Sequence, residues 1–408
     1  MLKQNTMLAS KGAKSSLLPR KTRSDIETSQ INGKPARVNG GKPTTITPKT
    51  TVVRPKIPGK VVPKKLIKKP ASFEETSTKK QTKPTNNEQG SDIQTFTDSI
   101  QEFIKLLNSK NANDRELRIA LKGIRQLVLQ FGIPDHKTFC GSLRNSVWKI
   151  LLGIYRIDAK EYISSIQRGP STVADKIEND VFRTLTTDKS FQNTVSNEMI
   201  KRLLNAFVWK ANDQPRTRLV NVSFTYVQGM NVLAAPFLYV MPELDAFFSF
   251  SSFIQYSCPL YVQPALDGVH CGIKLLDRCL YEFDLPLFLH LKKHGVMATV
   301  YAFPWVMTFS ACIPPLNQVL KLWDFFLAYG VHLNILSIIA QLHFIRDGLL
   351  ESTNPMKLLR DMPILNTTDT IKKVLELVEE CPEDIYDMLV RHPYDATVYD
   401  TILELEDV

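Results

Sequence analysis

Two polar side chains in this 408-residue sequence could take part in chemistry. The guanidinium of Arg183 could stabilise negative charge, and the carboxamide of Gln228 could position a water molecule. Gln228 directly precedes Gly229, and a glycine allows another molecule to approach the backbone closely. A glutamine side chain donates and accepts hydrogen bonds without carrying charge, so it suits the positioning of a water molecule or an amide. The plainer alternative is an ordinary loop glutamine, which a single short motif does not exclude.

Arg183 is expected on the exposed side of a helix over 171–185. Apolar residues repeat there at every fourth position and predict the buried stripe: Val173, Ile177, Val181 and Leu185. At about 100° per residue, Arg183 points away from that stripe. Asp180 lies three residues earlier on nearly the same face, close enough to orient the guanidinium. The alternative is an exposed ion pair of no functional interest. Ser171 or Thr172 is expected to cap the helix.

Gln228 is expected at the mouth of a buried helix, because it lies between a polar run (211–223) and the most apolar part of the chain (232–241). Further helical patterns occur at 100–107, 117–128, 143–153, 245–256, 272–287, 301–313, 319–330, 335–345 and 368–390, the last as one or two peripheral helices. Strand signals are few, and no alternating run is long enough to build a sheet. The sequence therefore predicts an all-α domain from about residue 95 to residue 408.

The N-terminal part has a different composition. Residues 1–90 contain 20 Lys or Arg against 5 Asp or Glu, 9 of the 24 prolines and a single aromatic residue, Phe73. Such a segment cannot bury enough apolar surface to offset the entropy of ordering it, which predicts a disordered basic tail. Its clusters, such as Lys64-Lys65 and Lys68-Lys69, could bind an acidic surface of phospholipid, nucleic acid or microtubules, or the segment could be a solvated linker.

Several classes of protein are disfavoured. The six cysteines form no C-x-x-C pair, which is typical of free thiols in a cytosolic or nuclear protein. Met1 to Leu8 contains no signal-peptide core, and the longest apolar run, Met230 to Met241, is shorter than the ~20 residues of a membrane span. A soluble intracellular protein is expected.

Catalytic and ligand-binding motifs are also missing. The sequence contains no Walker-type phosphate loop, no G-x-G-x-x-G, no H-E-x-x-H and no G-x-S-x-G. His290 and His294 are four residues apart but have no acidic third ligand nearby. We therefore expect no metal and no cofactor. If Arg183 and Gln228 act chemically, they act on something that another protein brings.

Five short motifs occur in a fixed order: Gly132-Ile133-Pro134, Leu143-Arg144-x-x-Val147-Trp148-x-x-Leu151-Leu152-Gly153, Ile177-x-x-Asp180-x-x-Arg183, Tyr226-Val227-Gln228-Gly229-Met230-Asn231 and Trp323-Asp324. In order and spacing this set resembles the TBC-domain family, which consists mostly of GTPase-activating proteins (GAPs) for Rab-like small GTPases. The resemblance implies an all-α TBC domain over 132–360. A disordered tail (1–92) and a helical lead-in (93–131) precede it, and C-terminal helices (361–408) pack on it.

The resemblance also implies roles for individual residues. Arg183 matches the arginine finger, which neutralises charge on the phosphates in the transition state of a GTPase held in trans. Gln228 matches the glutamine finger, which aligns the attacking water. Four further residues match supporting positions: Asp180, Tyr226, Gly229 and Arg144. Asp180 would brace the arginine, and Asn145 departs from the glycine that many members have after Arg144, which concerns packing more than catalysis.

The phrase from Tyr226 to Tyr239 and the compact domain most resemble the fungal spindle-position checkpoint branch, which restrains mitotic exit or septation. This implies a GTP-bound Rab-like GTPase and a scaffold subunit of a two-component GAP as partners, and a cytoplasmic location at the cytoskeleton or spindle pole body. Two alternatives remain: a non-catalytic TBC module that binds the GTPase or the scaffold, and a tether acting through the basic tail. The paired presence of Arg183 and Gln228 favours catalysis.

Overall fold

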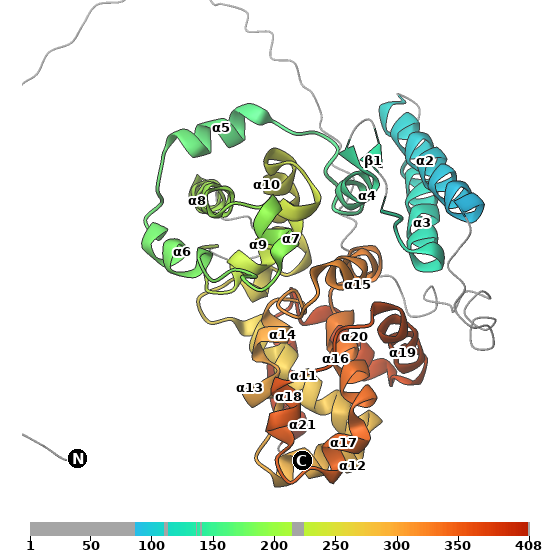
Figure 1. Cartoon of the computed structure of the whole chain (residues 1–408), viewed down its shortest axis with the longest axis vertical. Coiled ribbons are helices and arrows are strands. Elements are labelled where there is room, and N and C mark those ends of the chain that lie inside the picture. Colours follow the sequence, from blue (N-terminus) through green and yellow to red (C-terminus); the bar gives the residue numbers. More distant parts are fainter. Residues whose placement is uncertain (1–85, 110–112, 136, 139–140, 214–223, 407–408) are drawn as a thin grey trace, which may run out of the picture. The chain divides into compact units, whose positions relative to one another are not determined.

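The computed structural model describes residues 86–109, 113–135, 137–138, 141–213 and 224–406 (Figure 1). The predicted tail at 1–92 therefore lies almost wholly outside the described residues, as do Cys140 and most of the polar run at 211–223. The helical pattern that the sequence shows from Thr95 onward begins earlier in the structure, at Asn86.

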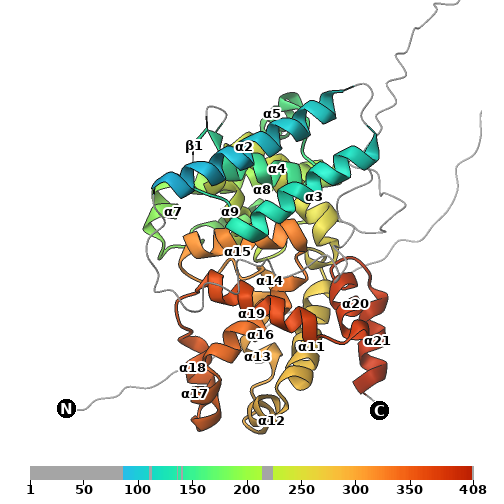
Figure 2. The same ribbon diagram turned by 90° about the vertical axis from the view of Figure 1, so that its right-hand side faces the viewer.

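Two long helices lead into the domain. Helix α2 (Asn86–Asn108) packs against α3 (Asp114–Phe131), as Figure 2 shows; both helices contact α4 (Leu143–Leu151), and α3 also contacts α15 (Leu316–Tyr329). A capping box starts α3, because the Asn113 side chain accepts from the backbone N–H of Glu116 while the Glu116 side chain accepts from the N–H of Asn113. The lead-in thus packs on two helices that are far apart in sequence.

The only sheet in the described residues is a hairpin of two-residue strands, β1 (Lys137–Thr138) and β2 (Gly141–Ser142), paired antiparallel. Strands this short leave no alternating pattern in the sequence, which is why none was expected. Ser142 ends the hairpin and caps α4 by accepting from the backbone N–H of Asn145. The all-α class predicted from the sequence is confirmed.

One group of helices surrounds α8, which Figure 1 shows almost end-on. Its members are α5 (Ala159–Gln167), α6 (Ala174–Val181), α7 (Lys189–Thr194), α8 (Asn197–Asp213), α9 (Met230–Val240) and α10 (Glu243–Ser252). Helix α8 packs against α5, α6, α9 and α10. The ring of Phe250 lies edge-on to Phe207 at 5.3 Å and to Phe237 at 6.1 Å, and these contacts join three of the helices. Sequence periodicity did not single out α5, α7 or α8.

Two short helices, η2 (Phe253–Ser257) and η3 (Pro259–Tyr261), connect α10 to a second group of helices, which lies below α15 in Figure 1. Its members are α11 (Asp267–Phe283), α12 (Leu285–Lys293), α13 (Ala298–Tyr301), α14 (Phe303–Met307), α16 (Leu333–Phe344), α17 (Arg346–Glu351), α18 (Pro355–Arg360), α19 (Thr367–Glu380), α20 (Glu383–Arg391) and α21 (Thr397–Glu406). Helix α11 packs against α12, α16 and α20, and α19 packs against α15 and α16. Val374, Leu377 and Leu389 are buried, so the helices at 368–390 are less peripheral than their charged residues suggested.

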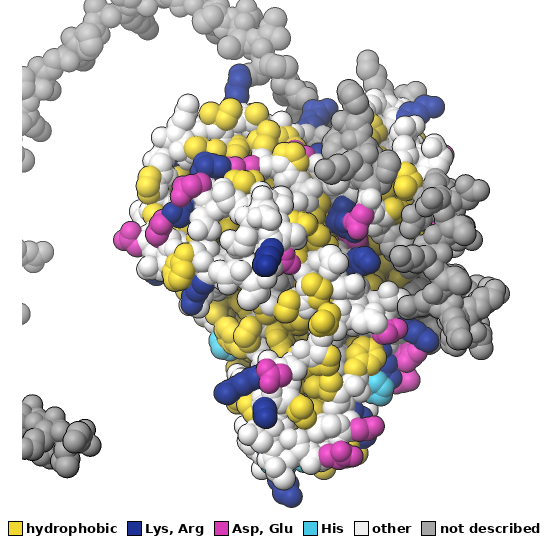
Figure 3. Space-filling model, in the orientation of Figure 1, with side chains coloured by type: hydrophobic (Ala, Val, Ile, Leu, Met, Phe, Trp, Pro, Cys, Tyr) yellow, Lys and Arg dark blue, Asp and Glu magenta, His cyan; other side chains and the backbone are white. Residues whose placement is uncertain are grey.

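Apolar side chains also reach the surface. On the face shown in Figure 3 they gather around α13 and α14, whereas charged side chains are more frequent near α5 and α6. Val300 of α13, for example, is 54% exposed. None of the helices in the described ranges is both long enough and apolar enough to cross a lipid bilayer.

Candidate functional site

Arg183 lies in a run of turns just after α6, because that helix ends at Val181 rather than continuing to Leu185. The predicted capping by Ser171 or Thr172 is wrong: the residue at the N-cap is Val173, which makes no side-chain cap bond. The chain before α6 is instead fixed by α8, since the Asn205 carboxamide oxygen accepts from the backbone N–H of Ser171 at 2.7 Å. The expected exposure of Arg183 is confirmed, because half of its side chain is accessible.

Asp180 connects Arg183 to the interior. One carboxylate oxygen of Asp180 forms an ion pair with the Arg183 guanidinium, and the other accepts a hydrogen bond of 2.6 Å from the hydroxyl of Tyr226. Only 8% of the Asp180 side chain is exposed, against 50% for Arg183. The Asp180 carboxylate is therefore buried and has two partners, so this ion pair differs from the exposed pair that the sequence left as an alternative.

Tyr226 is the buried partner in this network, with 4% of its surface exposed. Burial, together with the hydrogen bond to Asp180, raises the pKa of the Tyr226 phenol well above its ordinary value. The hydroxyl therefore remains a proton donor to Asp180 throughout the physiological range.

Gln228 stands immediately before α9, as predicted for the mouth of a buried helix. Gly229 occupies the N-cap with φ +104°, a left-handed conformation that favours glycine. A Cβ atom at Gly229 would lie 3.1 Å from two side-chain carbons of Met307, so α14 also approaches closely. The Gln228 carboxamide is exposed and makes no hydrogen bond within the described part of the chain, which leaves it available to a partner.

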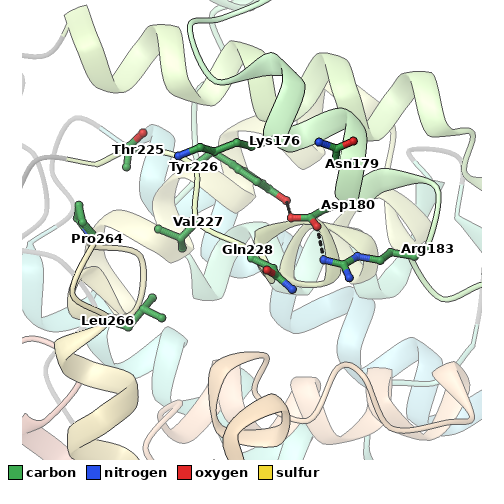
Figure 4. Close-up of a pocket in the computed structure, with 10 residues that line it drawn as sticks. All are labelled: Lys176, Asn179, Asp180, Arg183, Thr225, Tyr226, Val227, Gln228, Pro264 and Leu266. Carbon is green, nitrogen blue, oxygen red and sulfur yellow. Dashed lines mark hydrogen bonds and ion pairs between the residues drawn. The ribbon is translucent and has the colours of Figure 1, made fainter. Parts of the chain in front are cut away.

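Arg183 and Gln228 line one open cleft of about 730 Å³, shown in Figure 4. The lining comprises Lys176, Asn179, Asp180, Arg183, Thr225, Tyr226, Val227, Gln228, Pro264 and Leu266. It contains no His and no Cys, so this cleft offers no cysteine or histidine for nucleophilic or general-base chemistry. What it offers is a cationic fork and a neutral carboxamide that face the same space. Within the described ranges, no group of three His, Cys, Asp or Glu side chains is placed to hold a metal ion.

The sequence analysis did not assign six of the lining residues to the site, and two of these, Thr225 and Val227, adjoin the predicted Tyr226. Lys176 and Asn179 precede Asp180 by four residues and one residue, and Lys176 lies seven residues before Arg183; helical spacing alone could have found them. Pro264 and Leu266 come from the segment before α11 and carry no sequence signal that links them to the cleft.

Arg144, a predicted supporting residue, is not among the residues that line the cleft. It is buried between α4 and α15, where its Nε donates to both carboxylate oxygens of Asp324 at 3.0 and 3.2 Å. Its other nitrogens bind Asp135 and the carbonyl oxygen of Ile133, and the indole N–H of Trp148 donates to Asp324 at 2.6 Å. Arg144 therefore fixes the packing of the domain and does not face the site.

Burial affects the two charges of this pair differently. Burial raises the pKa of Asp324 to about 6, although the attraction of Arg144 opposes that rise. Burial alone would lower the pKa of the Arg144 guanidinium, but the carboxylates of Asp324 and Asp135 raise it above its ordinary value. Arg144 thus stays charged, because the two carboxylates stabilise its positive charge.

Comparison with known proteins identifies the class. The sequence profile of the Rab-GTPase-TBC domain matches residues 141–350, about half of the chain. The chain therefore belongs to the Rab-GTPase-TBC domain family, which confirms the resemblance seen in its motifs.

Two named relatives and one solved structure are similar to this chain over most of their own length. Cell division control protein 16 of Schizosaccharomyces pombe is 43% identical over 274 residues, which cover 67% of this chain and 88% of the relative. Mitotic check point protein BUB2 of Saccharomyces cerevisiae is 36% identical over 295 residues, which cover 69% of this chain and 95% of the relative. The crystal structure of the Ypt/Rab-GAP domain of Gyp1p shares the fold, with a TM-score of 0.53 at 19% identity over 70% of this chain and 97% of that one.

Proposed function

We propose that this chain is a GTPase-activating protein that stimulates GTP hydrolysis on a Rab-like small GTPase by supplying Arg183 and Gln228 in trans. The observation that carries the proposal is that both side chains line one cleft although they come from separate segments. Membership of the Rab-GTPase-TBC domain family supports a Rab-like GTPase as the partner.

The chemistry follows from the two side chains. Hydrolysis of GTP gathers charge on the phosphate oxygens, and a guanidinium delivered in trans stabilises that charge, which is worth about 10³–10⁵ in rate. Arg183 meets this need because its outer half is exposed while Asp180 holds it from the buried side. The uncharged carboxamide of Gln228 would orient the attacking water. In this proposal the chain has no nucleotide site of its own and accelerates its partner's reaction.

The names of the relatives suggest the cellular process in which this chain would act. One carries the name of a cell division control protein and another that of a mitotic check point protein. By analogy, this chain would restrain mitotic exit or septation. It would act as the catalytic half of a two-component GAP with a scaffold subunit, at the cytoskeleton or spindle pole body. The basic tail, predicted from sequence, would contact an acidic surface there.

The competing function is a TBC module that binds the GTPase or the scaffold without catalysis. It requires no particular arrangement of Arg183 and Gln228. Their convergence on one cleft, with the arginine braced by a buried carboxylate, favours the catalytic function.

Single-turnover hydrolysis tests the proposal. The purified full-length chain would be mixed with each of a panel of GTP-loaded Rab-like GTPases, with and without the candidate scaffold subunit. We expect at least one GTPase to be stimulated by the wild-type chain and none by the Arg183→Ala/Gln228→Leu double variant, which should still bind. Binding without stimulation by the wild-type chain under every condition would instead establish the binding module.

A further inference from the structure

Asn231 is the second residue of α9 and is almost fully buried, with 4% of its surface exposed. Its carboxamide oxygen accepts a hydrogen bond of 3.2 Å from the backbone N–H of Gly229, the residue after Gln228. Its carboxamide nitrogen donates to the carbonyl oxygen of Asp180 at 3.2 Å and to the hydroxyl oxygen of Thr184 at 2.9 Å. One side chain thus contacts the segments that carry both candidate fingers.

The contacts on the arginine side meet a specific need. The carbonyl oxygens at the end of a helix lack partners within that helix, and α6 ends one residue after Asp180. The carbonyl oxygen of Asp180 receives the N–H of Arg183 at 3.3 Å and the hydroxyl of Thr184 at 3.3 Å, in addition to Asn231. Asn231 therefore helps to close the end of α6 in the turn from which Arg183 projects.

A second contact flanks Gln228 on its other side. Tyr226 binds the side chain of Asp180, whereas Asn231 binds its main chain. The Gln228 segment is thus attached to the Arg183 segment at two points, one before and one after Gln228. Because Asp180, Thr184 and Asn231 are all buried, water cannot replace these bonds cheaply.

We infer that Asn231 is a positioning residue that holds the Arg183 turn and the Gln228 segment at a fixed distance from each other. Both side chains then have the correct spacing before a GTPase binds. This rests on the proposed function of the cleft and adds how the two fingers are coupled. Preorganised groups stabilise a transition state without the cost of being ordered at the moment of reaction. Loss of Asn231 would therefore affect the rate at saturation more than the binding of the GTPase.

Three variants of the full chain separate the contacts. Asn231→Ala removes both the donor to the arginine turn and the acceptor for Gly229. Thr184→Val removes only the hydroxyl on the arginine side and keeps the shape of the side chain, and Thr184→Ser restores that hydroxyl. On the GTPase that the wild-type chain stimulates most, we expect Asn231→Ala to lower kcat about 10- to 100-fold with KM changed less than about threefold. Thr184→Ser should retain kcat within about threefold, and Thr184→Val should not.

Hydrogen exchange tests the coupling without any GTPase. In Asn231→Ala we expect backbone amides in both 181–188 and 224–231 to exchange at least about tenfold faster, while α16 is unchanged. In Thr184→Val only the first segment should be accelerated. Acceleration of neither segment, or equal acceleration of both segments and α16, would overturn the inference. Failure of the wild-type chain to stimulate any GTPase would defeat the proposed function alone, because the exchange result still decides whether Asn231 couples the two segments.

Discussion

The hydroxyl of Tyr226 donates a hydrogen bond of 2.6 Å to the carboxylate of Asp180, and this carboxylate also forms an ion pair with Arg183. A residue two positions before Gln228 therefore holds the group that orients the arginine. The segments that carry the two candidate fingers are therefore joined by the side chains of Tyr226, Asp180 and Arg183.

Tyr226→Phe removes only the hydroxyl of this unit and leaves the buried ring in place. Because one oxygen of Asp180 then loses its buried donor, we expect the free energy of unfolding to fall by about 1–2 kcal/mol. We also expect kcat for GTPase stimulation to fall about 5- to 30-fold, because Arg183 is less well oriented. Urea unfolding and single-turnover hydrolysis measure the two effects. Wild-type values in both would show that the contact has no consequence.

Arg183→Ala should lower stimulation of GTP hydrolysis by about 10²–10⁴ and leave complex formation largely intact, because the guanidinium acts on charge that develops in the transition state. Stopped-flow phosphate release and a binding titration give the two quantities. Arg183→Lys is the matched control: it keeps the charge but lacks the planar fork, so it should recover only a small part of the rate. An unchanged hydrolysis rate in Arg183→Ala would remove this residue from the mechanism.

Gln228→Leu should cause a loss comparable to that of Arg183→Ala, because leucine has a similar volume but cannot hydrogen bond to water. The same single-turnover assay applies, with Gln126→Leu, a change at an exposed glutamine of α3, as the control. Full activity in Gln228→Leu would mean that the GTPase supplies its own glutamine.

The Arg144–Asp324 pair should be important for stability. Asp324→Asn leaves the buried guanidinium of Arg144 with only the exposed carboxylate of Asp135 as a partner charge, and we expect the free energy of unfolding to fall by about 3–5 kcal/mol. The double variant Arg144→Met/Asp324→Leu should be less destabilised than Asp324→Asn, because neither charge remains buried alone. Equilibrium unfolding in urea compares them, and a double variant at least as unstable as Asp324→Asn would contradict this reasoning.

Stability should decrease as the solution becomes acidic. Burial lowers the pKa of His332 to about 3 and that of His392 to about 4, whereas an unfolded histidine takes up a proton near pH 6.5. Burial keeps His392 neutral, although its hydrogen bond to Leu389 by itself would raise the pKa. In the neutral ring Nδ1–H donates to the Leu389 carbonyl oxygen at 2.6 Å, and Nε2 accepts from the Tyr261 hydroxyl at 2.8 Å. The unfolded chain therefore binds more protons between about pH 4 and 6.5, and stability is lost as the pH falls through that window.

At pH 5 each of these two histidines lowers the free energy of unfolding by about 2 kcal/mol relative to its value at pH 7. Asp324 acts in the opposite sense, because its raised pKa of about 6 lets the folded state take up a proton first; this offsets roughly 1 kcal/mol. Urea unfolding at pH 7 and pH 5 measures the net loss. His392→Gln should lose less stability between the two pH values than the wild-type chain. Equal losses would contradict the inference that His392 takes up its proton only when the chain unfolds.

The sequence by itself determined the local features of the site. Apolar residues at every fourth position placed Arg183 on the exposed side of its segment, and the apolar run after Gly229 placed Gln228 at the start of a buried helix. Both results depend on helical periodicity and glycine geometry, which are properties of consecutive residues.

Tertiary packing decided the rest. Local patterns could not show that Asp180 is buried against Tyr226, that Arg144 faces Asp324 instead of the cleft, or that Pro264 and Leu266 complete the lining. They also did not reveal that Val173, and not Ser171 or Thr172, stands at the start of α6. Each of these outcomes depends on contacts between segments distant in the chain, and the spacing of residues within one segment carries no information about which other segment will cover it.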